Sequence, residues 1–145
     1  MEDTGKKKAW LGIDPGREKC GLALVADDHS TLKLDVCPAR RLVQAVGELL
    51  GETPELTILL GDGTGHRTVK PALEEAFPNT PLLMVSERHS SEEAREMYFS
   101  DHPPRGILRL VPRGLLKPGK LIDAYAAKAI VFRHLNAIKK DGNGV

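Results

Sequence analysis

Three acidic residues stand at positions where carboxylates can do chemistry. Asp14 ends an apolar segment and precedes the turn Pro15-Gly16, and Glu87 follows the apolar run at 82–86. Asp123 falls in the first turn of a final helix whose same-face neighbours are small and apolar, so it should face the protein body. Strand ends in an open α/β sheet converge on one crevice, and we expect the three carboxylates to meet there.

Clustered carboxylates repel one another, which raises their pKa values unless a cation neutralises them. All-oxygen ligands with open water positions suit Mg²⁺ or Mn²⁺. Two such ions roughly 4 Å apart can cleave a phosphodiester, one activating water and the other stabilising the leaving oxygen. The three acids therefore predict a two-metal site.

Each acid also has an ordinary structural explanation. An Asp before Pro-Gly is common turn chemistry, so Asp14 can be a turn residue. Glu87 can form a surface ion pair with Arg88, and Asp123 can interact with the helix dipole. The metal site is favoured because all three acids occupy such positions together.

The elements that must position these acids follow from the apolar pattern. Strands are expected at residues 9–14, 21–26, 31–36, 56–60 and 81–86, and helices at 42–50, 66–77, 90–99 and 120–138. Four prolines and three glycines exclude a regular helix over 101–119. The order predicts an α/β protein with a mixed sheet, whose later strands are parallel to the first and buried on both faces.

The 145 residues favour one domain at 9–139, with flexible ends at 1–8 and 140–145. The formal net charge of +1 gives no global attraction to nucleic acid or membrane, so any basic site must be local. Cys20 and Cys37 are expected to be buried, reduced thiols. We find no signal peptide and no bilayer-spanning run, and we expect a cytoplasmic, soluble protein without membrane partners.

Three blocks of sequence resemble the signature blocks of the YqgF family in order and spacing: Gly12-Ile-Asp-Pro-Gly16, Ser86-Glu-Arg-His-Ser-Ser-Glu-Glu-Ala94 and Ile122-Asp-Ala-Tyr-Ala-Ala127. That family comprises RuvC-like nucleases with the ribonuclease H fold, described as Holliday-junction resolvases and pre-16S rRNA processing enzymes. The resemblance implies a five-stranded mixed sheet, three antiparallel strands continued by two parallel ones, flanked by helices. It also implies that Asp14, Glu87 and Asp123 are the metal-binding catalytic acids.

Two positions depart from the family pattern. Ser86 stands where many members carry an acid, and Lys120 stands where RuvC-type resolvases often have a His or an acid. A fourth metal ligand is therefore not assigned by the resemblance. Asp62, in the loop Gly61-Asp-Gly-Thr-Gly65, is a candidate, and the alternative is a tight glycine-rich turn before a helix.

A basic stretch leads into Asp123, since residues 102–122 contain no acid. Basic side chains beside a carboxylate site would hold the phosphates of a nucleic acid, and the alternative is a solvated loop. The candidate contacts are Arg17, Lys19, Arg105, Arg109, Arg113, Lys117 and Lys120. His66 and His89 follow site-lining strands and could assist proton transfer, although a histidine at a helix start is more often structural. The few aromatic residues favour recognition of backbone and shape, in branched DNA or structured RNA.

Together these features predict a metal-dependent nuclease acting on structured nucleic acid, with a homodimer as one option. One rival is a non-catalytic nucleic-acid-binding module on the same fold. Another is an actin-like or sugar-kinase-type ATPase, which also uses an Asp-x-Gly turn and a second glycine-rich loop. That class needs two lobes, and 145 residues suffice for one, so this alternative requires a dimer that forms the cleft.

Overall fold

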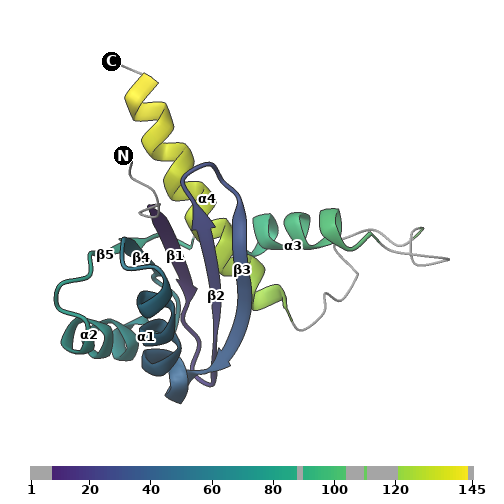
Figure 1. Ribbon diagram of the computed structural model, residues 1–145. Coiled ribbons are helices and arrows are strands. Elements are labelled where there is room, and N and C mark those ends of the chain that lie inside the picture. The colour runs from purple at the N-terminus through teal and green to yellow at the C-terminus, as the bar shows by residue number, and fades with distance from the viewer. Residues whose placement is uncertain (1–7, 88–89, 104–109, 111–120, 144–145) are drawn as a thin grey trace.

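The computed structural model describes residues 8–87, 90–103, 110 and 121–143, and it contains one five-stranded sheet in the order β3-β2-β1-β4-β5 (Figure 1). β1 pairs antiparallel with β2, and β2 with β3, whereas β4 and β5 continue the sheet in parallel to β1. The predicted mixed sheet is confirmed. The strands are β1 (Ala9–Asp14), β2 (Lys19–Ala26), β3 (Thr31–Pro38), β4 (Leu56–Gly61) and β5 (Leu82–Val85).

Helices cover both faces of this sheet. They are η1 (Ala39–Arg41), α1 (Leu42–Glu52), α2 (His66–Ala76), α3 (Ser90–Asp101) and α4 (Ile122–Asn143). α1 and α2 pack on one face, and α4 runs across the other, behind the strands in Figure 1. α3 packs against α4. No helix in the described part of the chain is both long and apolar enough to cross a membrane.

Strand alternation decides which face each β1 residue meets. Leu11 and Ile13 belong to the core beneath α1 and α2, while Trp10 belongs to the core beneath α4. With a period of two, Asp14 points to the α4 side. β1 therefore buries Leu11 and Ile13 under α1 and directs the side chain of its last residue, Asp14, toward α4, which carries Asp123.

Two glycines let α4 lie very close to the sheet. A Cβ atom on Gly12 would lie 2.3 Å from the Ala127 carbonyl oxygen, and one on Gly21 would lie 1.8 Å from the Asp123 carbonyl oxygen. Gly21 is also the cross-strand partner of Asp14. Any side chain at position 21 would therefore push the first turn of α4 away from Asp14.

The last strand differs from its prediction. β5 spans four residues, and it is not buried on both faces, because Leu83 and Met84 are 44% and 39% exposed and only Val85 is buried. The physical reason is its place in the sheet, since β5 is an edge strand with β4 as its single strand neighbour. α4 also continues to Asn143, five residues beyond the predicted end. The buried, unpaired cysteines Cys20 and Cys37 agree with expectation.

Candidate active site

The three predicted acids come from three different elements and meet at one edge of the sheet. Asp14 is the last residue of β1, Glu87 lies two residues beyond β5, and Asp123 is the second residue of α4. β1, β4 and β5 are parallel, so their carboxyl ends share this edge. Asp14 interacts electrostatically with both Glu87 and Asp123. The structure thus brings the three carboxylates together.

The carboxyl group of Asp14 has a strongly raised pKa. Burial is the largest cause that raises its pKa, from the ordinary 3.8 to about 8. The charge of Glu87, a hydrogen bond with the Glu87 carboxylate and the charge of Asp123 raise the pKa further. At neutral pH and without a cation, Asp14 therefore retains a proton that it can donate to Glu87.

Within the part of the chain that the structure describes, two carboxylate oxygens of the cluster have no hydrogen-bond partner. They are Glu87 Oε2 and Asp123 Oδ2, and both are buried. Lys19 Nζ lies 3.3 Å from Asp123 Oδ2, an ion pair without the geometry of a hydrogen bond. Orphaned buried oxygens cost free energy unless a donor or a cation satisfies them. This donor set suits a hard divalent cation.

The acids are nevertheless not arranged as a closed set of ligands. Within the described residues, no group of three or more His, Cys, Asp or Glu side chains is disposed to hold a metal ion. The Asp14 proton and the Lys19 ammonium offset part of the negative charge instead. The Asp14 proton and the Lys19 ammonium thus occupy carboxylate oxygens that a cation would need.

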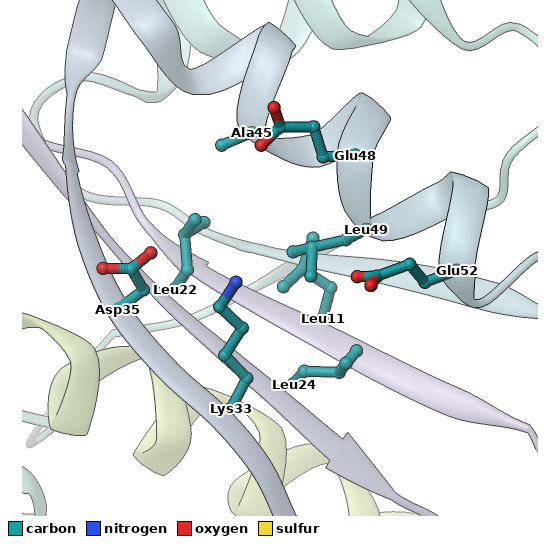
Figure 2. A pocket seen from close by; sticks show the side chains of 9 residues that line it. All are labelled: Leu11, Leu22, Leu24, Lys33, Asp35, Ala45, Glu48, Leu49 and Glu52. Carbon is teal, nitrogen blue, oxygen red and sulfur yellow. The ribbon is translucent and has the colours of Figure 1, made fainter.

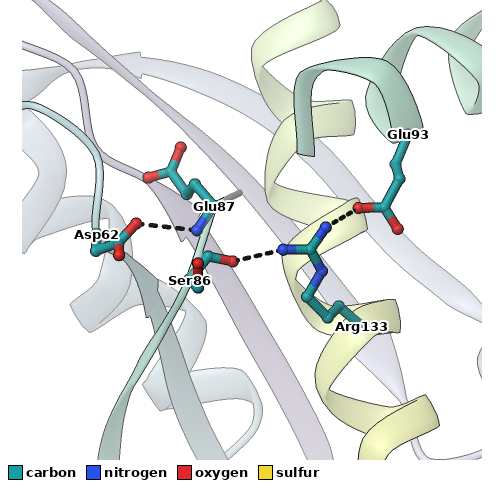
Figure 3. Close-up of polar contacts among 5 residues, drawn as sticks. All are labelled: Asp62, Ser86, Glu87, Glu93 and Arg133. Carbon is teal, nitrogen blue, oxygen red and sulfur yellow. Dashed lines mark hydrogen bonds and ion pairs between the residues drawn. The ribbon is translucent and has the colours of Figure 1, made fainter. Parts of the chain in front are cut away.

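Glu87 is held by its main chain from two sides, as Figure 3 shows. Its backbone N–H donates to Asp62 Oδ1 over 2.9 Å. Arg133 of α4 donates from Nη1 to the carbonyl oxygen of Ser86 over 2.9 Å, and from Nη2 to Glu93 of α3. Asp62, which follows β4, thus holds the Glu87 N–H, while Arg133 of α4, itself bound to Glu93 of α3, holds the Ser86 carbonyl oxygen.

This network includes one residue that the sequence predicted for the site, Asp62, and one that it did not, Arg133. Asp62 is exposed, and one of its oxygens anchors the Glu87 main chain, so its role as a fourth metal ligand stays a prediction. Sequence reasoning missed Arg133. The available signal was a single arginine beside the buried run Ala129–Val131, a position where a long cation needs a partner.

Basic residues also border the acids. Arg17 and Lys19 line an open hollow of about 670 Å³ together with Asp14 and Asp123, and both cations are exposed. The other predicted contacts, Arg105, Arg109, Arg113, Lys117 and Lys120, and the candidate His89 lie outside the described residues. His66 Nδ1 lies 2.7 Å from the Gly63 carbonyl oxygen at the start of α2, which favours a structural role.

Another hollow, of about 250 Å³, lies on the opposite face of the sheet, between β3 and α1 (Figure 2). Leucines form its floor, and Lys33, Asp35, Glu48 and Glu52 surround its rim. Leu11, on the α1 side of β1, lines it, whereas Asp14 points to the α4 side. This hollow is therefore separate from the carboxylates.

Two solved structures of RuvC resemble this chain over most of its length. Thermus thermophilus RuvC in complex with a Holliday junction substrate is 19% identical, covering 91% of this chain and 96% of that one, with a TM-score of 0.60. The chain has the RuvC fold. A second Thermus thermophilus RuvC structure is 16% identical over the same shares, with a TM-score of 0.58.

The ribonuclease H-like fold predicted from the sequence is thereby confirmed. No family model matches the sequence. No curated protein matches it either. The finer assignment to the YqgF family stays a prediction that rests on the three sequence blocks.

Proposed function

We propose that this chain is a divalent-metal-dependent nuclease that hydrolyses phosphodiester bonds in structured nucleic acid. The observation that carries the proposal is the convergence of Asp14, Glu87 and Asp123, with two buried carboxylate oxygens that have no hydrogen-bond partner among the described residues. Among solved structures with this fold, one RuvC holds a Holliday junction substrate. Branched DNA is therefore the first substrate to test, and a pre-16S rRNA fragment, suggested by the sequence blocks, is the second.

In this proposal the carboxylates of Asp14, Glu87 and Asp123 would hold the Mg²⁺ or Mn²⁺ ions. Such ions supply an activated water and stabilise the leaving oxygen. Asp14 would hold a cation in its deprotonated form, because a nearby positive charge would offset the burial and the repulsion from Glu87 and Asp123 that raise its pKa. Asp62 and Arg133 keep the Glu87 main chain in place.

The exposed cations Arg17 and Lys19 would position the substrate. Lys19 pairs with Asp123 in this structure, and its side chain is 60% exposed, so it is free to turn toward a phosphate. Transfer of Lys19 from Asp123 to a substrate phosphate would leave Asp123 available to a cation. Binding of nucleic acid and of metal would then support each other.

The testing experiment compares cleavage by the wild type, Asp14→Asn and Asp35→Asn in Mg²⁺ and Mn²⁺. Asp35 is an exposed acid on β3 and serves as the matched control. Substrates are a labelled four-way DNA junction, linear duplex, single strands and a structured pre-rRNA fragment. We expect Asp14→Asn to lose about 10²–10³-fold in rate, the scale of losing one transition-state charge interaction. The substrate that is cut fastest assigns the activity to junction DNA or to RNA.

A non-catalytic nucleic-acid-binding module is the second candidate. It is favoured by one observation, that the described acids do not form a closed set of three metal ligands. If neither the wild type nor Asp14→Asn cuts any substrate while both bind equally, the nuclease proposal is wrong. The binding module would then take its place.

A further inference from the structure

A third hollow, of about 310 Å³, lies on the other side of the turn that joins β1 to β2. Its walls are aliphatic, with Leu42 and Val43 from α1 and Val69 and Ala72 from α2. Ligand pockets in proteins begin at roughly 300 Å³ and combine apolar walls with a few polar groups. The residues with polar side chains that line it are Arg17, Thr64 and Thr68.

This aliphatic hollow adjoins the hollow that holds the carboxylates. Gly16, Arg17 and Thr64 line both of them. Next to these shared residues, the Gly65 N–H donates to the Pro15 carbonyl oxygen over 3.3 Å. A Cβ atom on Gly65 would lie 2.6 Å from the Gly16 oxygen, so no side chain fits between these two backbone segments. Because the two hollows share part of their lining, a ligand in one can extend into the other.

We infer that the aliphatic hollow receives one unpaired nucleobase of the bound strand, while a neighbouring phosphate lies beside the carboxylates. The inference rests on the nucleic-acid binding in the proposed function. A base has the planar apolar faces that aliphatic walls accept and an edge that the Thr64 and Thr68 hydroxyls can hydrogen-bond. Arg17 lines both hollows and carries the charge that the intervening phosphate needs.

The inference restricts the class of substrate. A base reaches a recessed pocket only after it leaves the base stack and its pairing partner. Unstacking costs least where nucleotides are already unpaired, at the crossing point of a junction or in an RNA loop. The hollow would therefore favour such substrates over a continuous duplex. This preference does not require aromatic side chains that stack on bases.

The test fills the hollow from an exposed helix position. Ala72 is exposed on α2, so Ala72→Phe can occupy the hollow without disturbing the core. Ala76→Phe is the matched control, because Ala76 is exposed on the same helix one turn later and lines neither hollow. Equal thermal unfolding midpoints would show that both variants fold, and Ala72→Leu provides a milder filling.

The readout is the fluorescence of 2-aminopurine placed at successive positions of a four-way junction, measured in Ca²⁺ to suppress cleavage. We expect one position near the crossing point to change on binding to the wild type and to Ala76→Phe. That change should be lost with Ala72→Phe, together with about tenfold in affinity, equivalent to 1.4 kcal/mol. Ala72→Leu should give an intermediate loss.

Identical fluorescence and affinity for Ala72→Phe and Ala76→Phe would overturn the inference. A free mononucleotide that competes as well as the junction would overturn the strand part of it and indicate a small-molecule nucleotide site. Absence of cleavage in Mg²⁺ and Mn²⁺ with the Ala72-dependent signal intact would instead overturn the nuclease proposal alone. The two failures are therefore distinguishable.

Discussion

At neutral pH the side chain of Asp14 is protonated in the folded chain and ionised in the unfolded chain. Burial and the two neighbouring acids raise its folded pKa from 3.8 to about 8. The folded state therefore binds one more proton than the unfolded state between these values. In that interval stability falls as the pH rises, because the unfolded state binds fewer protons.

Metal-free wild type and Asp14→Asn should therefore differ in how their stability depends on pH. The contribution of the Asp14 proton is fully present below pH 3.8 and is lost as the pH rises to about 8. Urea unfolding across this range should show the free energy of unfolding of the wild type falling relative to that of Asp14→Asn. Added Mg²⁺ should reduce the difference. Parallel pH profiles would contradict the raised pKa.

Arg133 is expected to act on the chemistry through Glu87. Arg133→Gln removes the donors to the Ser86 carbonyl oxygen and to Glu93, which frees the segment that carries Glu87. We expect about 10–100-fold slower cleavage, the usual cost of losing a group that orients a metal ligand. The free energy of unfolding should fall by only about 1–2 kcal/mol.

A rise in the Mg²⁺ concentration needed for half-maximal cleavage separates this positioning role from a purely structural one. Lys139→Gln, an exposed cation on the same helix, is the control and should leave both quantities unchanged. Slower cleavage with an unaltered Mg²⁺ requirement would count against an effect through Glu87.

At the scale of elements, α4 is the part that assembles the site. Its first turn carries Asp123, and Arg133 lies further along the same helix. Its buried face packs Ala127, Ile130 and Val131 against the sheet. One rigid helix thus sets the positions of one acid directly and of Glu87 through the Ser86 carbonyl oxygen.

Gly21→Ala should disturb this docking. The added Cβ would lie 1.8 Å from the Asp123 carbonyl oxygen, and backbone cannot rotate away as a side chain can. We expect a loss of about 1–3 kcal/mol in the free energy of unfolding, the usual cost of overpacking, together with slower cleavage. Denaturant unfolding and the junction assay measure both.

Gly51→Ala is the matched control, since a Cβ there meets no atom within 4 Å and the residue lies in α1. It should be neutral or should stabilise the chain by about 0.5–1 kcal/mol, as Gly to Ala does within helices. Equal effects of the two substitutions would show that α4 does not need the space at Gly21.

Across the whole molecule, local patterns were enough to predict most elements. Alternation and turn residues placed β1, β4 and α1 within about two residues of their observed bounds. The error at β5 arose because an apolar run of four residues reads alike in the centre and at the edge of a sheet. The position of a strand in the sheet depends on pairing between segments far apart in the chain. The residues of the strand itself therefore do not reveal whether it lies at the edge.

The site divides in the same way. Asp14 and Asp123 were predictable because a strand end and a helix start are local features. The Arg133 contact with Ser86, the Lys19 ion pair and the hollow beside Ala72 join segments far apart in the chain. Their geometry follows from packing, so residue type alone could not identify them.

The close approach of α4 to the sheet determines which residues evolutionary relatives of this chain should conserve. Gly12 and Gly21 are required by the distance between helix and strands, whatever the chain does. A descendant without the proposed nuclease activity would still need both glycines for this close docking of α4 on the sheet. It could exchange Asp14 or Glu87 freely, and burial at Asp14 would even reward an uncharged residue. Among evolutionary relatives, conservation of the two glycines would therefore indicate common ancestry. Conservation of the acids would indicate which relatives retain the proposed nuclease activity.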